Sequence, residues 1–162
     1  MLLLSQRLCY TTPVDSFVFA EVMEGTFAKK GERHLRPFCF ELNVKVPLSL
    51  PLMRLWTVQV VGDATGVVYI DGFAEEVPTS GKLEISPLYK RRIHYALSFV
   101  ADDGNNYLFD GTKLINWLKP ISTLTTLPGT VTNDAKDTVG SGLLHFSLIK
   151  HLPGLVRSLR LG

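Results

Sequence analysis

The clearest pattern in the chain is an alternation of apolar and polar residues over positions 38–46. Five apolar residues share one phase, namely Phe38, Phe40, Leu42, Val44 and Val46. The intervening positions are mostly polar. Because successive side chains of a strand point to opposite faces, this spacing predicts a β-strand with one buried face.

A second alternation runs through positions 93–99 and leads into a turn. Ile93, Tyr95, Leu97 and Phe99 share the apolar phase, and the stretch Asp-Asp-Gly-Asn-Asn at 102–106 follows. Gly and Asn tolerate positive φ, which tight hairpin turns require. We therefore expect a hairpin whose second strand begins near residues 107–109.

Other apolar runs predict further strands. The runs at 55–61 and 67–73 flank a Gly-Asp-Ala-Thr-Gly stretch at 62–66, which indicates another hairpin. Shorter strands are expected at 17–23, 83–85, 122–127 and 143–149. The total is about nine or ten strands, with a turn about every dozen residues, and this spacing is typical of a sandwich or barrel.

Two stretches are expected to be helical. Residues 111–118 form the first, ended by Pro120, and the tail after Pro153 forms the second. The tail is amphipathic and basic, so we expect it to pack over a barrel mouth or sheet edge, with docking to a membrane surface or a partner as the alternative. The PLSLP stretch at 47–51 predicts a bend or an edge.

These elements predict one domain over residues 1–162. Its fold class is all-β and mainly antiparallel, a lipocalin-like β-barrel of about nine or ten strands with one or two short helices, including a C-terminal one. A length of 162 residues, with 46% hydrophobic and 20% charged residues, fits a single globular core.

Charge and the N-terminus narrow the function classes. Lys and Arg number 17 against 15 Asp and Glu, an excess too small to favour nucleic acid as a partner. The apolar opening at residues 1–4 is too short for a signal peptide or a transmembrane segment. We therefore expect a cytoplasmic protein.

Motifs for catalysis, cofactors and metals are not evident. There is no GxSxG elbow, and Gly140-Ser141-Gly142 precedes an apolar run, which favours a strand start over phosphate binding. The four histidines lack local metal-site spacing, and Cys9 and Cys39 are expected to be free thiols. We predict no catalytic residue, no cofactor and no metal. An enzyme with Glu21 or a histidine as base stays open as an alternative.

Glu21 stands out because it shares its phase with Phe17, Phe19 and Met23. In that register the carboxylate points into an apolar interior, where it needs a cation or hydrogen-bond donors. Lys113 or Arg92 would be the partner. In the alternative register, residues 18, 20 and 22 form the core face and Glu21 is solvated.

The run FAEVMEG at 19–25 resembles the F-x-E-x-M-x-G signature of an accessory region found beside cholesterol-oxidase-like flavoenzymes of the GMC class. Further pieces at 93–99, 108–113, 125–127 and 140–144 follow in the same order, so the resemblance covers most of residues 17–161. The matching residues are Glu21, Met23, Gly25, Tyr95, Gly111, Lys113, Thr125 and Thr126.

This resemblance implies a β-rich, non-catalytic module linked to sterol or lipid metabolism, with a flavoenzyme as a possible partner. The chain lacks the GxGxxG unit of the flavoenzymes, so oxidase activity does not carry over. We expect a binding or accessory module that holds a hydrophobic small molecule, or else docks a partner enzyme or forms a homo-oligomer. The expected ligand-binding residues are Glu21, Met23, Phe38, Phe40, Leu42, Trp56, Val58, Tyr95, Leu97, Phe99 and Lys113.

Overall fold

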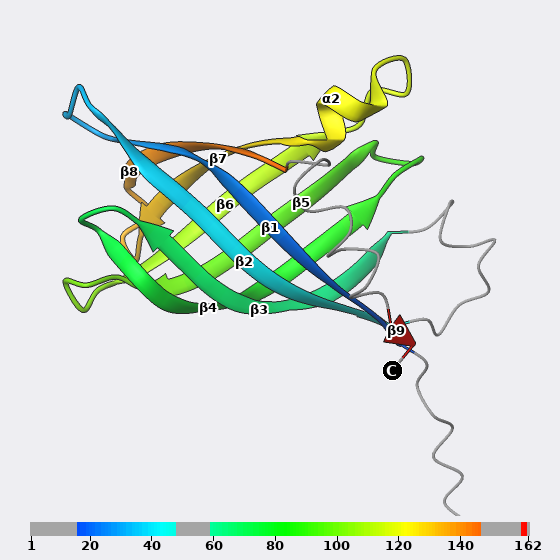
Figure 1. Cartoon of the computed structure of the whole chain (residues 1–162), viewed down its shortest axis with the longest axis horizontal. Helices are drawn as coiled ribbons and strands as arrows, with labels where there is room; N and C mark the ends of the chain where they lie inside the picture. Colours follow the sequence, from blue (N-terminus) through cyan, green and yellow to red (C-terminus); the bar gives the residue numbers. More distant parts are fainter. Residues whose placement is uncertain (1–15, 48–58, 147–159, 162) are drawn as a thin grey trace, which may run out of the picture.

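The computed structural model describes residues 16–47, 59–146 and 160–161, and strands dominate these parts (Figure 1). The long strands are β1 (Ser16–Lys29), β2 (Leu35–Pro47), β3 (Val60–Ile70), β4 (Ala74–Ser86), β5 (Arg92–Val100), β6 (Asn106–Leu114), β7 (Thr126–Asn133) and β8 (Thr138–His145). A short helix, α2 (Pro120–Leu124), lies between β6 and β7. The two-residue strand β9 (Arg160–Leu161) pairs with β1.

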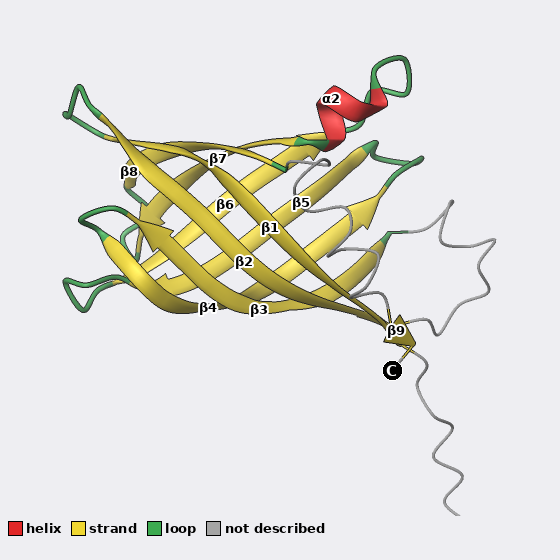
Figure 2. Cartoon of the chain, in the orientation of Figure 1, coloured by secondary structure: helices red, strands yellow, loops and turns green. Residues whose placement is uncertain are grey.

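The eight long strands form a closed antiparallel barrel (Figure 2). Each strand pairs with the next in the chain, and β8 pairs with β1 from Glu24↔His145 to Lys29↔Gly140. The all-β, antiparallel prediction is therefore confirmed. The barrel has eight long strands, fewer than the nine or ten that the sequence indicated, because the runs at 55–61 and 67–73, expected to be two strands, both overlap the single strand β3.

The two ends of the barrel carry different connections (Figure 1). Four tight turns lie at one end, which we call the hairpin end: residues 30–34, 71–73, 101–105 and 134–137. Residues 87–91 and 115–125 connect strands at the opposite end, which we call the α2 end because the second of these connections contains the helix. In the figure, the hairpin end is at the left and α2 is at the upper right.

The alternating residues of β2 face the barrel interior, as their period predicted. Phe38, Phe40, Leu42, Val44 and Val46 are all buried. In β5, Tyr95, Leu97 and Phe99 are buried and Ile93 is half-buried. The hairpin expected after β5 is also present, with its turn at residues 101–105.

Phenylalanine rings fill the interior of the hairpin half. The ring of Phe109 lies 4.9 Å from that of Phe40 and 5.6 Å from that of Phe38, measured between centroids. Inward-facing glycines make room for these rings: a Cβ on Gly111 would lie 2.7 Å from Phe109, and one on Gly142 would lie 2.6 Å from Phe38. Large and small residues thus interlock, as in a packed core.

The turn predicted at residues 62–66 was wrong. The strand β3 runs without interruption from Val60 to Ile70, and the chain turns at 71–73. Gly62 and Gly66 occupy inward positions in phase with Val68. A Cβ on Gly66 would overlap the backbone carbonyl of Glu41 in β2, so this glycine serves close strand packing.

The elements predicted around Pro120 were also wrong. Residues 111–114 complete β6, and Pro120 begins α2, where its missing N–H costs no hydrogen bond. Residues 122–124 belong to this helix, and β7 starts at Thr126. The tail predicted to be helical contributes the strand β9 at Arg160–Leu161, and its other residues lie outside the described ranges, as does the PLSLP stretch beyond Pro47.

Candidate functional site

Glu21 lies inside the barrel, with 8% of its surface exposed. It is paired in register with Leu42 of β2, whose side chain is also buried. The register that points this carboxylate inward is therefore the one that the chain adopts. Val18, Ala20 and Val22 occupy the opposite phase of β1.

The Glu21 carboxylate binds two side chains, one from β6 and one from β5. The Lys113 ammonium donates to Oε1 at 2.5 Å, and the Tyr95 hydroxyl donates to Oε2 at 3.0 Å. The Lys113 Nζ also lies 5.0 Å from the centroid of the Tyr95 ring. We call Glu21, Lys113 and Tyr95 the lumen triad. Arg92, the other cation that the sequence suggested, instead binds Glu84 at 3.2 Å.

The lumen triad links β1 to two strands, β5 and β6, with which β1 does not pair. The strand β1 pairs with β2, β8 and β9, whereas Lys113 and Tyr95 come from β6 and β5. Their separations from Glu21 along the chain are 92 and 74 residues. The contacts therefore cross the inside of the barrel and connect its opposite walls.

The electrostatics of the triad follow from its burial. Burial, together with the nearby Glu21 charge, raises the pKa of the Tyr95 phenol well above its ordinary value, so the hydroxyl stays a donor at neutral pH. The Glu21–Lys113 ion pair has no net charge. An ammonium offers three N–H donors, and Glu21 is the one hydrogen-bond acceptor of Lys113 within the described part of the chain.

The other residues expected to bind a ligand divide into two groups. Trp56 and Val58 lie outside the described residues. The remaining six are buried in the core: Met23, Phe38, Phe40, Leu42, Leu97 and Phe99. The rings of Phe38 and Phe40 are tilted relative to each other with centroids 4.8 Å apart, and both pack against Phe109. The structure thus brings Glu21, Tyr95 and Lys113 together as a polar cluster and places these apolar residues around the barrel core.

Three inward-facing apolar residues near the α2 end are only half-buried, although others there, such as Val44 and Val46 of β2, are buried. Ile85 of β4 and Ile93 of β5 face each other in register and are half-buried, as is Phe19 of β1. All three pack against the core. We call Phe19, Ile85 and Ile93 the rim residues, because they lie near the strand ends beside the lumen triad, with Ile93 directly in register with Lys113.

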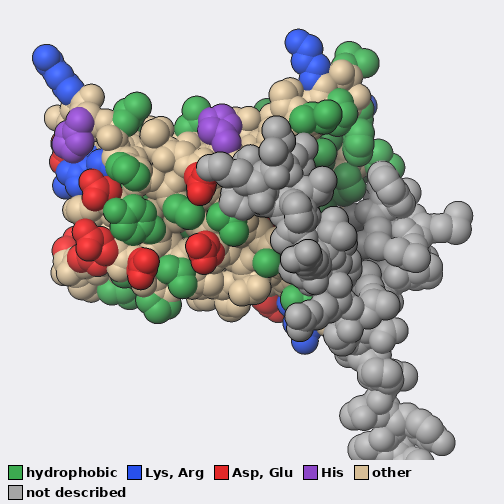
Figure 3. Space-filling model, in the orientation of Figure 1, with side chains coloured by type: hydrophobic (Ala, Val, Ile, Leu, Met, Phe, Trp, Pro, Cys, Tyr) green, Lys and Arg blue, Asp and Glu red, His purple; other side chains and the backbone are tan. Residues whose placement is uncertain are grey.

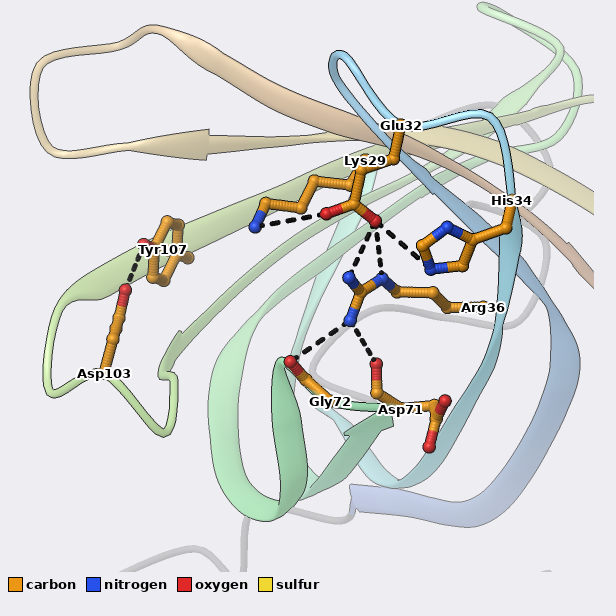
Figure 4. Close-up of polar contacts among 8 residues, drawn as sticks. All are labelled: Lys29, Glu32, His34, Arg36, Asp71, Gly72, Asp103 and Tyr107. Carbon is orange, nitrogen blue, oxygen red and sulfur yellow. Dashed lines mark hydrogen bonds and ion pairs between the residues drawn. The ribbon is translucent and has the colours of Figure 1, made fainter.

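The hairpin end is closed by aromatic packing and by an arginine whose contacts Figure 4 shows. The ring centroids of Phe73 and Tyr107 lie 4.9 Å apart, and both side chains are buried. Arg36 donates to Glu32 Oε2 at 2.7 Å and to the carbonyls of Asp71 and Gly72 at 3.0 and 3.2 Å. It therefore ties the β1–β2 turn to the β3–β4 turn. The hydrogen bond from Arg36 lowers the pKa of Glu32.

The histidines in the described ranges lie away from the lumen triad. His94 Nε2 is 3.0 Å from Asp110 Oδ2, and His145 Nδ1 is 3.4 Å from Thr126 Oγ1. Neither contacts Glu21, so neither forms with it the titratable pair that the catalytic alternative requires. Within residues 16–47, 59–146 and 160–161, no group of three or more His, Cys, Asp and Glu side chains is arranged to hold a metal ion.

A shallow hollow of about 510 Å³ lies outside the barrel. It is lined by Cys39, Glu41, Val67, Tyr69 and Glu76. Cys39 is a free thiol there. Partial burial, together with Glu41 and Glu24, raises the pKa of this thiol to about 11, so it is not a reactive thiolate at neutral pH.

Sequence reasoning missed the Arg36 bridge and the outer hollow. Glu32 lies in the turn at 30–34 and Arg36 follows in β2, and their spacing of four residues was an available signal for one of the Arg36 contacts. The two carbonyl contacts come from residues more than thirty positions away. Only the closed fold brings them to Arg36.

Comparisons with family models, curated proteins and solved structures gave no match. The resemblance to an accessory region beside cholesterol-oxidase-like flavoenzymes therefore stays a prediction. No helical segment in the described parts of the chain has the length and hydrophobicity that crossing a bilayer requires.

Proposed function

We propose that the barrel binds a small apolar molecule in the half nearest α2, with the lumen triad as its polar anchor. One observation carries this proposal: a buried ion pair and a phenol cross the lumen beside apolar rim residues that remain half-buried. Buried ionic groups are costly to desolvate and are a weak source of stability. A polar cluster in an apolar interior is also the arrangement that orients ligands in binding sites.

The architecture supports a ligand site at this end. Closed up-and-down barrels of eight strands can hold one small ligand inside, as lipocalins do. In this chain the rings of Phe38, Phe40 and Phe109 fill the hairpin half. The ligand is therefore assigned to the α2 half, where it would contact the rim residues and extend toward Lys113.

The charge of the triad favours a neutral ligand that carries an oxygen, such as a long-chain alcohol, a ketone or a sterol. Lys113 has N–H donors beyond the one that Glu21 accepts, so an oxygen of the ligand can accept a hydrogen bond there. The carboxylate and ammonium already cancel. A fatty-acid anion would add an uncompensated negative charge to a poorly solvated site, which is unfavourable.

The location can be tested with N-phenyl-1-naphthylamine, a neutral apolar dye whose fluorescence rises on binding. Wild-type protein should bind it saturably. Ile93→Trp adds a bulky ring among the rim residues and should weaken binding by at least about tenfold. Val100→Trp is the matched control, because Val100 lies on the same strand with 49% of its surface exposed. No saturable binding, or equal loss in both variants, would remove the proposal.

The head-group preference can be tested by displacing the dye with decan-1-ol or decanoate at neutral pH. Wild-type protein should prefer the alcohol, and Lys113→Met should weaken alcohol binding by about tenfold. Glu21→Gln leaves Lys113 as an unpaired cation and should reverse the preference in favour of decanoate. Circular dichroism checks that each variant folds. A wild-type preference for decanoate would refute the neutral head group while leaving the binding site intact.

A further inference from the structure

Large apolar side chains are exposed on the two connections at the α2 end. Leu118 is 92% exposed, Tyr89 79% and Ile121 68%, and Trp117 is 45% exposed. Among the described residues, the turns of the hairpin end contain no exposed large apolar side chain, and Phe73 is buried there. Exposed apolar patches of this kind mark surfaces that contact a protein or a membrane.

The two connections are held together and are locally ordered. The backbone N–H of Ile115 donates to the carbonyl of Arg91 at 2.7 Å, which joins the β4–β5 and β6–β7 connections. The Leu118 N–H donates to Asn116 Oδ1 at 2.9 Å, and the Asn116 N–H donates to Thr123 Oγ1 at 3.1 Å. The exposed apolar residues are therefore presented as one fixed surface.

This surface is also basic. Residues 87–91 and 115–125 contain three cations and no acidic residue, the cations being Lys90, Arg91 and Lys119. The four turns of the hairpin end contain three Lys and Arg residues against six acids, a net charge of minus three. The acids are Glu32, Asp71, Asp102, Asp103, Asp134 and Asp137. The described connections of the α2 end thus carry a net charge of plus three, part of which Glu84 of β4 offsets by pairing with Lys90 at 3.0 Å, and the turns of the hairpin end carry minus three.

We infer that the α2 end docks onto an anionic membrane surface. Trp and Tyr side chains favour the interface between lipid and water, and basic residues are attracted to anionic lipids. The charge difference between the ends would turn the α2 end toward such a surface. The helix and the loop before it project beyond the strand ends, with apolar and basic side chains around them (Figures 1 and 3). A projecting tip suits insertion among lipid head groups better than it suits a flat protein interface.

This inference does not depend on the proposed ligand. Co-sedimentation with vesicles tests it, using phosphatidylcholine alone and phosphatidylcholine mixed with phosphatidylserine. Wild-type protein should sediment with the mixed vesicles, and added salt should weaken this binding because it screens the charges. The double variant Leu118→Asp/Ile121→Asp should lose at least about tenfold in partitioning. Leu35→Asp is the matched control, since Leu35 is 63% exposed at the hairpin end.

A second pair of variants separates charge from apolar contact. Arg91→Glu should reduce binding to the mixed vesicles by about tenfold and leave weak binding to phosphatidylcholine unchanged. Lys136→Glu is its control, because both residues adopt positive φ, 50° and 63°, and Lys136 lies at the hairpin end. Equal loss from Lys136→Glu, or no sedimentation with either vesicle, would overturn the inference. A dimer in sedimentation velocity that Leu118→Asp abolishes would reassign the surface to a second copy of the chain.

Discussion

At the hairpin end, Phe73 and Tyr107 are buried against each other and Arg36 joins two turns, whereas at the α2 end Ile85 and Ile93 face inward but remain half-buried. The exposed apolar residues and the basic charge of the connections also lie at the α2 end. This difference indicates that the two ends of a single antiparallel barrel can serve different roles. We infer that the filled half contributes most to stability, and we propose that the other half carries recognition.

The largest expected effect comes from Phe109→Ala in the filled half. Phe109 is fully buried and packs against Phe38 and Phe40, so its removal leaves a cavity and should lower the free energy of unfolding by about 4 kcal/mol. Ile93→Ala at the α2 end should cost about 1 kcal/mol, because less apolar surface is buried there. Urea denaturation measures both. Equal losses would contradict the assignment of stability to the hairpin half.

The next effect comes from breaking the lumen triad. Lys113→Met leaves the Glu21 carboxylate buried without its cation and should cost about 3 kcal/mol. Removing both charges and the phenol hydroxyl in Glu21→Leu/Lys113→Met/Tyr95→Phe should restore most of that loss, since neither an unpaired charge nor an unsatisfied hydroxyl remains. Lys82→Met is the control, because Lys82 pairs with Asp63 on the exposed surface, where ion pairs contribute little. A triple variant less stable than Lys113→Met would show that the pair itself is stabilising.

The smallest effect concerns the Arg36 bridge. Arg36→Met should lower stability less than Lys113→Met does, because its contacts with Glu32 and the two carbonyls are partly solvated. The bond from Arg36 lowers the pKa of Glu32 in the folded state, so its contribution is present above the ordinary value of 4.5. It is lost as the pH falls through the lowered folded value. Chemical denaturation across this range should show wild type and variant converging in acid, and a constant gap would argue against the ion pair.

Much of the barrel could be predicted from local periodicity. The alternation in β2 and β5 and the turn after Val100 follow from side-chain phase and turn residues, which neighbours in the chain determine. The wrong predictions concern residues whose role depends on parts of the chain outside the local pattern. Gly66 was interpreted as part of a turn, yet it is needed because β2 passes close to it. Pro120 was interpreted as the end of a helix, yet it begins one.

The candidate site was also predictable in part, again from local periodicity. The phase of β1 indicated that Glu21 points inward, and the need to neutralise it suggested Lys113. The role of Tyr95 as a donor to this carboxylate depends on closure, since β5 lies across the lumen from β1. Ligand binding by these residues stays a prediction. The docking surface was not foreseen, because Trp117 and Leu118 were placed in a predicted helix and residues 87–91 were given no predicted role.

The pairing of β1 with β8 has a consequence for biosynthesis. The first strand of the ring gains its second long neighbour only when residues 138–145 have been made. Until then, β1 and the most recently completed strand both offer unsatisfied backbone groups that can recruit other chains. A truncated chain that ends before β8 should therefore aggregate, even though it contains nearly all of the phenylalanine residues that fill the core.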